Sequence, residues 1–387
     1  MMGFPGKPVP NSGWNQSMTN EKSGDEPFSG SYRTEDVQFL LKPIDIDPIE
    51  VAEKERLIQS GRRHYSEMLS RESLPSASYL DVFHRALAMG LEPMSRGALD
   101  LAAIIAARRP GDITLVSLAR AGTPVGVALK HLLREVFGRD SAHYSISIIR
   151  DRGIDRNALR FILGQAGRDP AGILFVDGWT GKGVIARELR HALADFERDQ
   201  GVRLDPDLYA LTDLAGVGVA PSDADYLIPS SILNATMSGL VSRSILNERI
   251  GPDDFHGCVY YREFAHADLS TWFIDELLAK ARALIAEGYV PSDRPVDPVA
   301  ARSRSAAMLD AIRKSFGIRD ENFIKPGIGE ATRVLLRRVP ERVIIRDPDA
   351  PEVAHLLELA REKDVRWQVD SGLPYQAVSL IKGVNDA

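Results

Sequence analysis

Four apolar segments of strand length alternate with helix-length segments between residues 113 and 214, and this alternation constrains the fold more than any other feature. The predicted strands are 113–118, 143–149, 172–177 and 208–214. Parallel strands need long crossover connections, which helices usually supply. The pattern therefore predicts an α/β fold in which a parallel sheet carries helices on both faces.

The rest of the chain divides by composition. Helical spacing recurs at 48–70, 79–91, 96–108 and 268–287. Strands and helices alternate again near the C-terminus, which predicts a small α/β/α module. We predict a disordered segment at 1–30, a core domain at 31–288, a proline-bearing linker at 289–318 and this module at 319–387.

Composition excludes several classes of protein. The 387 residues carry a net charge of −6, so the chain is not a globally basic coat for nucleic acid. The single cysteine, Cys258, excludes an intramolecular disulfide and a multi-cysteine zinc site. No apolar run reaches membrane-spanning length, and no secretory signal opens the chain. We expect a cytoplasmic protein without a membrane partner, and the histidines show no metal-ligand spacing.

The segment from Ile173 onward carries the clearest chemical signal. An apolar strand ends at Asp177, a turn with three glycines follows, and a helix begins at once. Such a turn lets backbone N–H groups approach an anion, and the helix N-terminus adds positive potential. The expected contributors here are Asp177, Gly178, Trp179, Thr180, Gly181, Lys182 and Gly183.

A second strand-to-helix turn lies about 55 residues upstream. It contains Arg120, Ala121, Gly122 and Thr123, and we expect Thr123 to cap a helix that opens at Pro124. Both turns follow parallel strands, so their ligand groups should meet at one edge of the sheet. A third polar loop offers Arg150 and Arg152 as cations for the same edge.

The turn at Asp177 resembles the phosphoribosyl-diphosphate loop of type I phosphoribosyltransferases. The resemblance implies catalytic roles for Asp177, Arg120 and Lys182, and substrate binding by the remaining residues of the three loops. It also implies Mg²⁺ bound with phosphoribosyl diphosphate and a base-like acceptor. Two positions depart from that family: Gly178 replaces a second carboxylate, and Lys182-Gly183 replace the usual ending of the turn.

Longer stretches resemble a narrower family. HYSISIIRDRGID, FVDGWTGKG, YLIPSSILNATMSGLVSR and DFHGC are similar to the StiP-type phosphoribosyltransferase-like proteins of tellurite- and stress-resistance gene clusters. That resemblance implies an enzyme that transfers ribose 5-phosphate in the synthesis of a nucleoside-like metabolite. Assembly into a homodimer is a further hypothesis. The same family carries the description of a cysteine protease.

The C-terminal segments KPGIGEATRVLLRR, RVIIRDPDAP and LPYQAV resemble a Pelota-type RNA-binding domain. The resemblance implies RNA as a partner, with its backbone contacted at a glycine-rich helix start. The matching positions are Lys325, Gly327, Gly329, Arg333 and Arg337.

Two alternatives remain open. A cysteine protease would need Cys258 as a thiolate beside a base. The surrounding FHGCVYY segment is typical of a strand, and side chains two positions apart on a strand are about 7 Å apart, so His256 is too distant. A non-catalytic regulator would sense the diphosphate and bind RNA through the C-terminal module, and the missing carboxylate at Gly178 favours this option.

Overall fold

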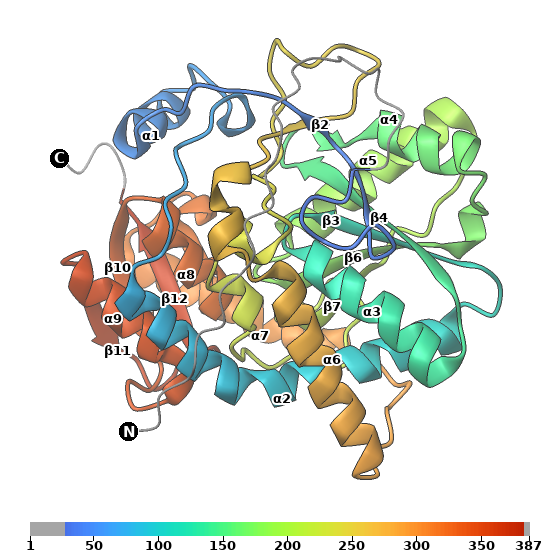
Figure 1. Ribbon diagram of the computed structural model, residues 1–387. Coiled ribbons are helices and arrows are strands. Elements are labelled where there is room, and N and C mark those ends of the chain that lie inside the picture. The colour runs from blue at the N-terminus through green and yellow to red at the C-terminus, as the bar shows by residue number, and fades with distance from the viewer. Residues whose placement is uncertain (1–27, 383–387) are drawn as a thin grey trace, which may run out of the picture.

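The core of the protein is a six-stranded sheet (Figure 1). A computed structural model describes residues 28–382. Five strands are parallel and lie in the order β1-β4-β3-β6-β7, and a short β5 pairs antiparallel with β4. Their bounds are β1 Gln38–Leu40, β3 Ile113–Ala119, β4 Ser141–Ile149, β5 Gly153–Ile154, β6 Ile173–Thr180 and β7 Leu208–Asp213. The predicted parallel sheet is confirmed.

Helices cover both faces of this sheet, as predicted. Three of them pack on one face: α2 (Ala77–Arg108), α3 (Gly122–Phe137) and α6 (Ser270–Ala286). Two pack on the other face: α4 (Arg156–Arg160) and α5 (Val184–Gln200). Parallel strands enclosed in this way are buried on both sides, which explains their continuous apolar runs.

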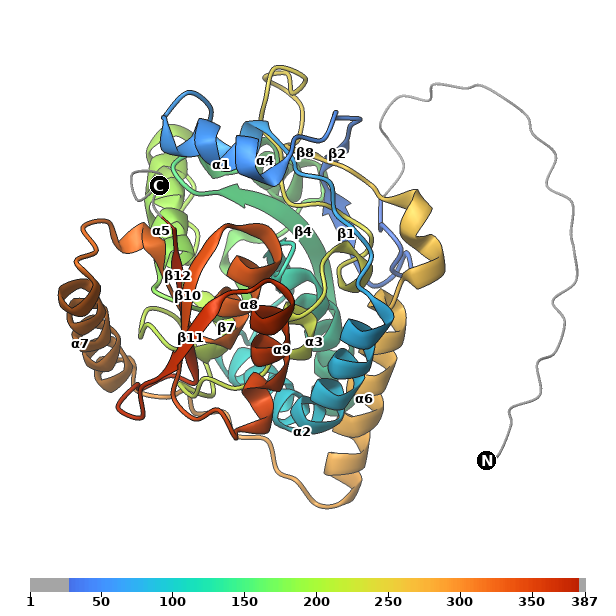
Figure 2. The ribbon, with the colours of Figure 1, turned by 90° about the vertical axis from the view of Figure 1, so that its left-hand side faces the viewer.

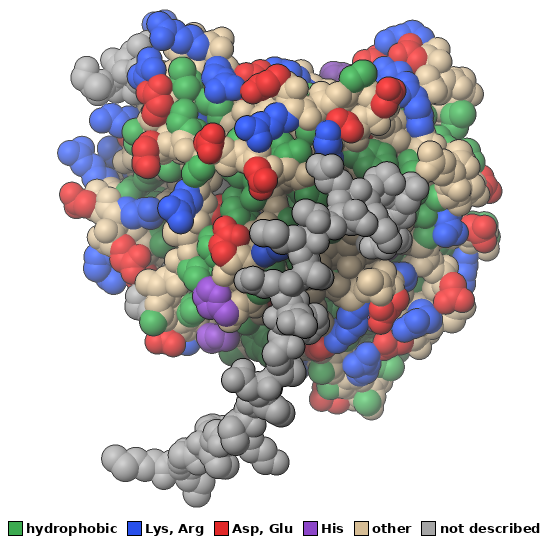
Figure 3. Space-filling model, turned by 45° about the horizontal axis from the view of Figure 1, so that its top comes forward, with side chains coloured by type: hydrophobic (Ala, Val, Ile, Leu, Met, Phe, Trp, Pro, Cys, Tyr) green, Lys and Arg blue, Asp and Glu red, His purple; other side chains and the backbone are tan. Residues whose placement is uncertain are grey.

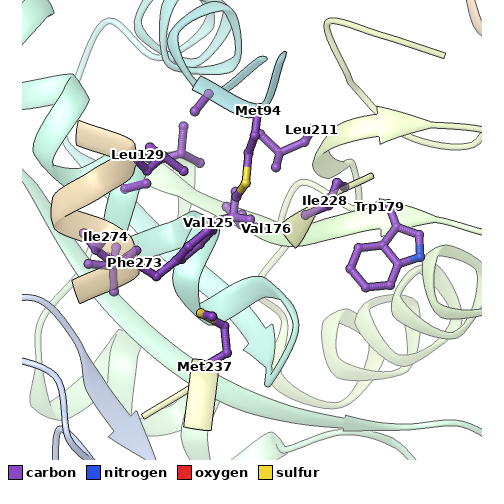
Figure 4. Close-up of a cluster of buried hydrophobic side chains, with 14 of the residues drawn as sticks. Met94, Val125, Leu129, Val176, Trp179, Leu211, Ile228, Met237, Phe273 and Ile274 are labelled. Atoms are coloured by element: carbon purple, nitrogen blue, oxygen red, sulfur yellow. The ribbon is translucent and has the colours of Figure 1, made fainter. Parts of the chain in front are cut away.

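The larger of the two core layers joins the sheet to α2, α3 and α6 (Figure 4). Met94, Val125, Val176, Leu211 and Phe273 are fully buried there. Complete burial of one such side chain stabilises the fold by about 1.5–3 kcal/mol. This layer holds the carboxyl ends of β3 and β6 in fixed positions.

The C-terminal module has a mixed sheet of four strands in the order β11-β10-β12-β9. The strands are β9 Ile324–Pro326, β10 Pro340–Ile345, β11 Arg366–Val369 and β12 Ala377–Ile381. α8 (Ile328–Arg337) and α9 (Ala354–Glu362) cover one face, and α7 (Pro298–Phe316) covers the other (Figure 2). The expected small α/β module is present, but one of its two helical layers is α7, which lies outside the predicted bounds of 319–387.

Helix α7 lies where composition indicated a linker. Asp297 caps its N-terminus by accepting a hydrogen bond from Val299 N at 3.0 Å, and Pro298 occupies the first turn. Met308 and Ile312 are buried against the module's sheet. Proline is favoured at a helix start, so Pro298 marks the beginning of a helix here and not a break in structure.

Three further predictions need adjustment. The helix expected at 48–70 is only α1 (Val51–Gln59), and the helices expected at 79–91 and 96–108 form the single helix α2, which contains Pro93. Residues 1–27 of the predicted disordered segment lie outside the described residues. Phe28 forms a bridge with Phe39, so the end of that segment is ordered.

Asp225 joins the module to the core. Its carboxylate accepts hydrogen bonds from Ile328 N, at the start of α8, at 3.0 Å and from Gln376 N, just before β12, at 2.9 Å. Tyr375 Oη donates to Leu214 O at 2.8 Å beside it. Burial raises the pKa of Asp225 to about 6, and the backbone N–H groups oppose that rise. Bonds from N–H groups to a carboxylate at a helix N-terminus are among the stronger hydrogen bonds in proteins.

Charged side chains of both signs are interspersed on the face shown in Figure 3. Across residues 28–382, no helix combines the length and the apolar character needed to cross a bilayer.

Candidate functional site

A cavity of about 330 Å³ lies between the carboxyl edge of the core sheet and the C-terminal module. Residues of β6 and the start of α5 form one wall, and residues of β9 and α8 form the other. Its charged lining residues are Arg150, Asp177, Lys182, Lys325, Glu330, Arg333 and Arg338. Five cations against two carboxylates make this interdomain pocket suited to an anion.

Strand β6 runs further than predicted. Trp179 and Thr180 still pair with Thr212 and Asp213 of β7, so the strand does not end at Asp177. Only residues 181–183 form the turn before α5. Gly183 has φ +74°, a conformation that glycine adopts without strain, and it caps the helix.

Thr180 and Gly178 contact the protein itself. Thr180 Oγ1 donates to Asp213 Oδ1 at 2.5 Å and accepts from Ala215 N at 3.2 Å, and the residue is buried. Gly178 is buried beside the carbonyl of Ala121. The hydroxyl expected to bind a phosphate therefore already has two partners.

Asp177 and Trp179 line the interdomain pocket. Asp177 Oδ1 accepts a hydrogen bond from Gly178 N at 2.8 Å. Burial raises the pKa of Asp177 to about 6, and the positive charge of Arg333 lowers it in part. The Arg333 guanidinium lies 4.5 Å from the centroid of the Trp179 ring, in cation–π geometry.

The Arg120 loop lies directly beside Asp177, as predicted for two turns at one sheet edge. A Cβ on Gly122 would stand 2.3 Å from Val176 O and 3.1 Å from Asp177 Cα, so only glycine allows this approach. Arg120 is already paired, because it contacts Glu72 Oε1 at 2.7 Å and donates to Val241 O at 2.8 Å. Its guanidinium carries no unbalanced charge.

Two other predictions about these loops need correction. Helix α3 begins at Gly122, with Ala121 as its N-cap, so Thr123 lies inside the helix. Its Oγ1 lies 2.8 Å from Ser145 Oγ, away from the cavity. Arg152 does not line the pocket and pairs with Glu67 at 2.7 Å, whereas Arg150 does line it.

The residues predicted to contact RNA face the core domain. A Cβ on Gly329 would stand 2.4 Å from the Trp179 ring, and one on Gly327 would stand 2.8 Å from Leu214. Lys325 and Arg333 line the interdomain pocket. The side chain of Arg337 lies outside the described residues. An RNA that used these positions would have to enter the pocket.

Sequence reasoning missed Tyr65 as a lining residue, and it did not expect Glu330 and Arg338 of the C-terminal segment to lie in one pocket with it. Tyr65 follows α1, and its hydroxyl accepts a hydrogen bond from Arg150 N at 2.8 Å. Arg338 ends α8 and pairs with Glu55 at 2.7 Å. No local pattern places these three residues in one pocket, because the docking of distant segments brings them together.

Within residues 28–382, no three His, Cys, Asp or Glu side chains converge as metal ligands. Glu330, one of the two carboxylates in the pocket, already pairs with Arg333 at 3.0 Å. The Mg²⁺ expected together with a diphosphate stays a prediction.

Cys258 lies in a different place. It belongs to the short strand β8 (Gly257–Cys258), which pairs with β2 (Lys42–Pro43), and its side chain is fully buried in the apolar core. Burial raises the pKa of the Cys258 thiol to about 12. The ring of His256 is occupied, because its Nδ1 lies 2.7 Å from Ser147 Oγ.

Comparison with known proteins assigns the family. Residues 30–278 match the family described as tellurite-like stress resistance cysteine protease StiP, and residues 303–383 match the PELOTA RNA binding domain. The chain is 41% identical over 374 residues to the cysteine protease StiP of Acinetobacter baylyi, an alignment that covers 92% of this chain and 94% of the relative.

These matches overturn the expectation of a phosphoribosyltransferase. The matching family and the relative are both described as cysteine proteases, and neither is described as a glycosyltransferase. The predicted role of phosphoribosyl diphosphate had relied on Arg120 and Thr180, which are held by Glu72 and Asp213. The chain belongs to the StiP family of tellurite-like stress resistance proteins and carries a PELOTA-type domain at its C-terminus.

Proposed function

We propose that this protein is a cysteine protease held in a latent form, with Cys258 as its nucleophile. The observation that carries the proposal is the cysteine count. A protease of this class attacks through a thiolate, and the sequence offers one thiol. The relative described as a cysteine protease aligns over nearly the whole chain.

The latency follows from the surroundings of Cys258. A thiol with a pKa near 12 is neutral at physiological pH, and a fully buried sulfur cannot meet a peptide bond. Activation must therefore expose the β8 segment. Its pairing with β2 spans only two residues on each strand, but Gly257 also exchanges two backbone hydrogen bonds with Ile245, so local opening must break both sets.

Once exposed, Cys258 Sγ would attack a peptide carbonyl carbon as the thiolate. The C–N bond would break, and the leaving amine would take up the proton lost by the thiol. Water would then hydrolyse the thioester and restore the thiol. Each turnover would consume one water molecule and release two peptide ends.

The test measures cleavage of an unfolded protein substrate, such as reduced casein, by the full chain. Cys258→Ala should abolish cleavage, and so should alkylation of the thiol. Cys258→Val is a second variant that keeps the core filled, so loss of activity in both variants is not a packing effect. Cleavage that persists in both variants, or no cleavage by the wild type after β8 is opened in mild denaturant, would refute the proposal.

A second function is RNA binding by the C-terminal domain. The observation that favours it is the position of Lys325, Arg333 and Arg338 on one wall of the interdomain pocket. Cationic side chains bind the phosphate backbone, and such binding weakens steeply as salt concentration rises. Titration of a single-stranded RNA at several salt concentrations tests this function. An affinity that does not depend on salt, or no binding at low salt, would argue against it.

A further inference from the structure

The interdomain pocket has more positive than negative side chains among its lining residues. Three of its arginines have carboxylate partners: Arg150 contacts Asp151 at 3.1 Å, Arg333 contacts Glu330 and Arg338 contacts Glu55. The two lysines differ from them. Among residues 28–382, no carboxylate lies within ion-pair distance of Lys182 or Lys325.

These lysines come from opposite walls of the pocket. Lys182 follows β6 of the core, and its ammonium donates to the backbone carbonyl of Glu321 in the module. Lys325 lies on β9 of the module and makes no hydrogen bond through its ammonium to the described chain. Burial, and then the charge of Lys325, lower the pKa of Lys182 to about 8. Two partly buried cations that repel each other would be relieved by an anion between them.

The walls also carry two pairs of an aromatic ring and a guanidinium group. The rings of Tyr65 and Trp179 line the pocket. Guanidinium groups lie over both, Arg150 at 5.7 Å from the Tyr65 centroid and Arg333 at 4.5 Å from that of Trp179. A cavity of about 330 Å³ falls within the range that takes small ligands, at its lower end.

We propose that the interdomain pocket binds a phosphate-bearing ligand of about one nucleotide in size. The ammonium groups of Lys182 of the core and Lys325 of the module bind its phosphate. Two sources share this chemistry, a terminal phosphate of RNA and a small phosphorylated molecule. Only the first source rests on the RNA-binding function proposed above. A ligand held from both sides also stabilises the docked arrangement of the two domains, because it binds that arrangement alone.

The experiment titrates the full chain by calorimetry with three probes: inorganic pyrophosphate, a short single-stranded RNA with a 5′-phosphate, and the same RNA with a 5′-hydroxyl. Lys182→Gln and Lys325→Gln each remove one positive charge, and neither substitution breaks an ion pair within residues 28–382. Each variant should weaken pyrophosphate binding roughly tenfold or more, since a charge-assisted hydrogen bond is lost. Lys325→Arg keeps the charge and should retain most of the affinity.

Lys314→Gln is the matched control. Lys314 is exposed on α7 and pairs with Asp310 at 2.6 Å, outside the pocket, so its loss should leave pyrophosphate binding unchanged. Equal melting temperatures of the variants and the wild type would show that the fold is intact.

The outcomes separate the two proposals. Tighter binding of the 5′-phosphate RNA than of the hydroxyl RNA, with competition by pyrophosphate, identifies an RNA end as the ligand. Binding of pyrophosphate without binding of either RNA supports a small phosphorylated molecule as the ligand of the pocket. The same result refutes the proposed RNA-binding function. Absence of saturable pyrophosphate binding, or binding that both glutamine variants leave unchanged, overturns the pocket itself.

Discussion

Two regions of this molecule contrast in their chemistry. Cys258 lies in an apolar layer, neutral and sealed from solvent, although the family's description depends on a thiol. The interdomain pocket is open and cationic, and within residues 28–382 no carboxylate forms an ion pair with either of its two lysines. The contrast agrees with the two proposals above: the pocket would bind an anion in the described conformation, and cleavage of a peptide by Cys258 would need a different arrangement of β8.

The largest expected effect concerns the sealed region. Alkylation of Cys258 by iodoacetamide at pH 8 should be at least roughly a thousandfold slower in the native protein than in the unfolded chain. An ordinary thiol is partly ionised at that pH, whereas one with a pKa near 12 is almost entirely neutral. Mass spectrometry of timed samples gives both rates. Rapid stoichiometric labelling of the native protein would mean that Cys258 is exposed, and the contrast would disappear.

The second prediction concerns Asp225, the residue that joins the C-terminal module to the core. Asp225→Ala leaves the Ile328 and Gln376 N–H groups without their acceptor, which should cost about 1–3 kcal/mol in unfolding free energy. The variant should also make residues 289–297 more sensitive to limited proteolysis, because docking of the module weakens. Asp223→Ala is the matched control on the same loop, since its pair with Arg304 is at the surface and contributes little. Equal effects of the two changes would show that Asp225 does not hold the module.

The third prediction tests the packing of α8 on Trp179. Gly329→Ala would place a methyl group 2.4 Å from the indole ring, so the helix must shift. We expect a loss of about 1–2 kcal/mol, even though alanine favours helices more than glycine does. Gly111→Ala is the control, because nothing lies within 4 Å of the added carbon. Denaturant unfolding measures both variants, and a Gly329→Ala protein as stable as wild type would place α8 elsewhere.

The fourth prediction concerns the pH dependence due to Asp177. Its pKa is near 6 in the folded protein and lower when the chain unfolds, so the folded state holds the proton more tightly. The stability of the wild type relative to Asp177→Asn should therefore increase as pH falls from 7 to 4. Thermal melts of both proteins at pH 7, 5.5 and 4 give the difference. A difference that is constant over this range would show that Asp177 is well solvated.

The sequence predicted those parts of the fold that depend on local pattern. The four core strands were recognisable because both faces of each are buried, and the adjacency of the Arg120 and Asp177 turns followed from parallel topology. Helix α7 was missed because Pro298 at its start looked like a break. The extension of β6 through Thr180 depends on pairing with Asp213, which no pattern within the loop reveals.

Only one wall of the interdomain pocket could be predicted from the sequence. Asp177 and Lys182 stood out from the strand–turn–helix pattern, whereas the opposite wall comes from β9 and α8, more than 140 positions later. Lys325 and Arg333 were singled out for RNA, but their place beside Lys182 is a consequence of docking. The FHGCVYY segment was correctly expected to form a strand, and the cysteine-protease alternative that this strand disfavoured is the one that the family's description supports.

The most direct test of the interdomain pocket is a crystal structure of the full chain soaked with tungstate, an oxyanion that anomalous scattering locates without ambiguity. The account predicts an anomalous peak between Lys182 Nζ and Lys325 Nζ, with both ammonium groups within hydrogen-bond distance of its oxygens. Tungstate bound only on the outer surface, with the space between the two lysines filled by water, would contradict it.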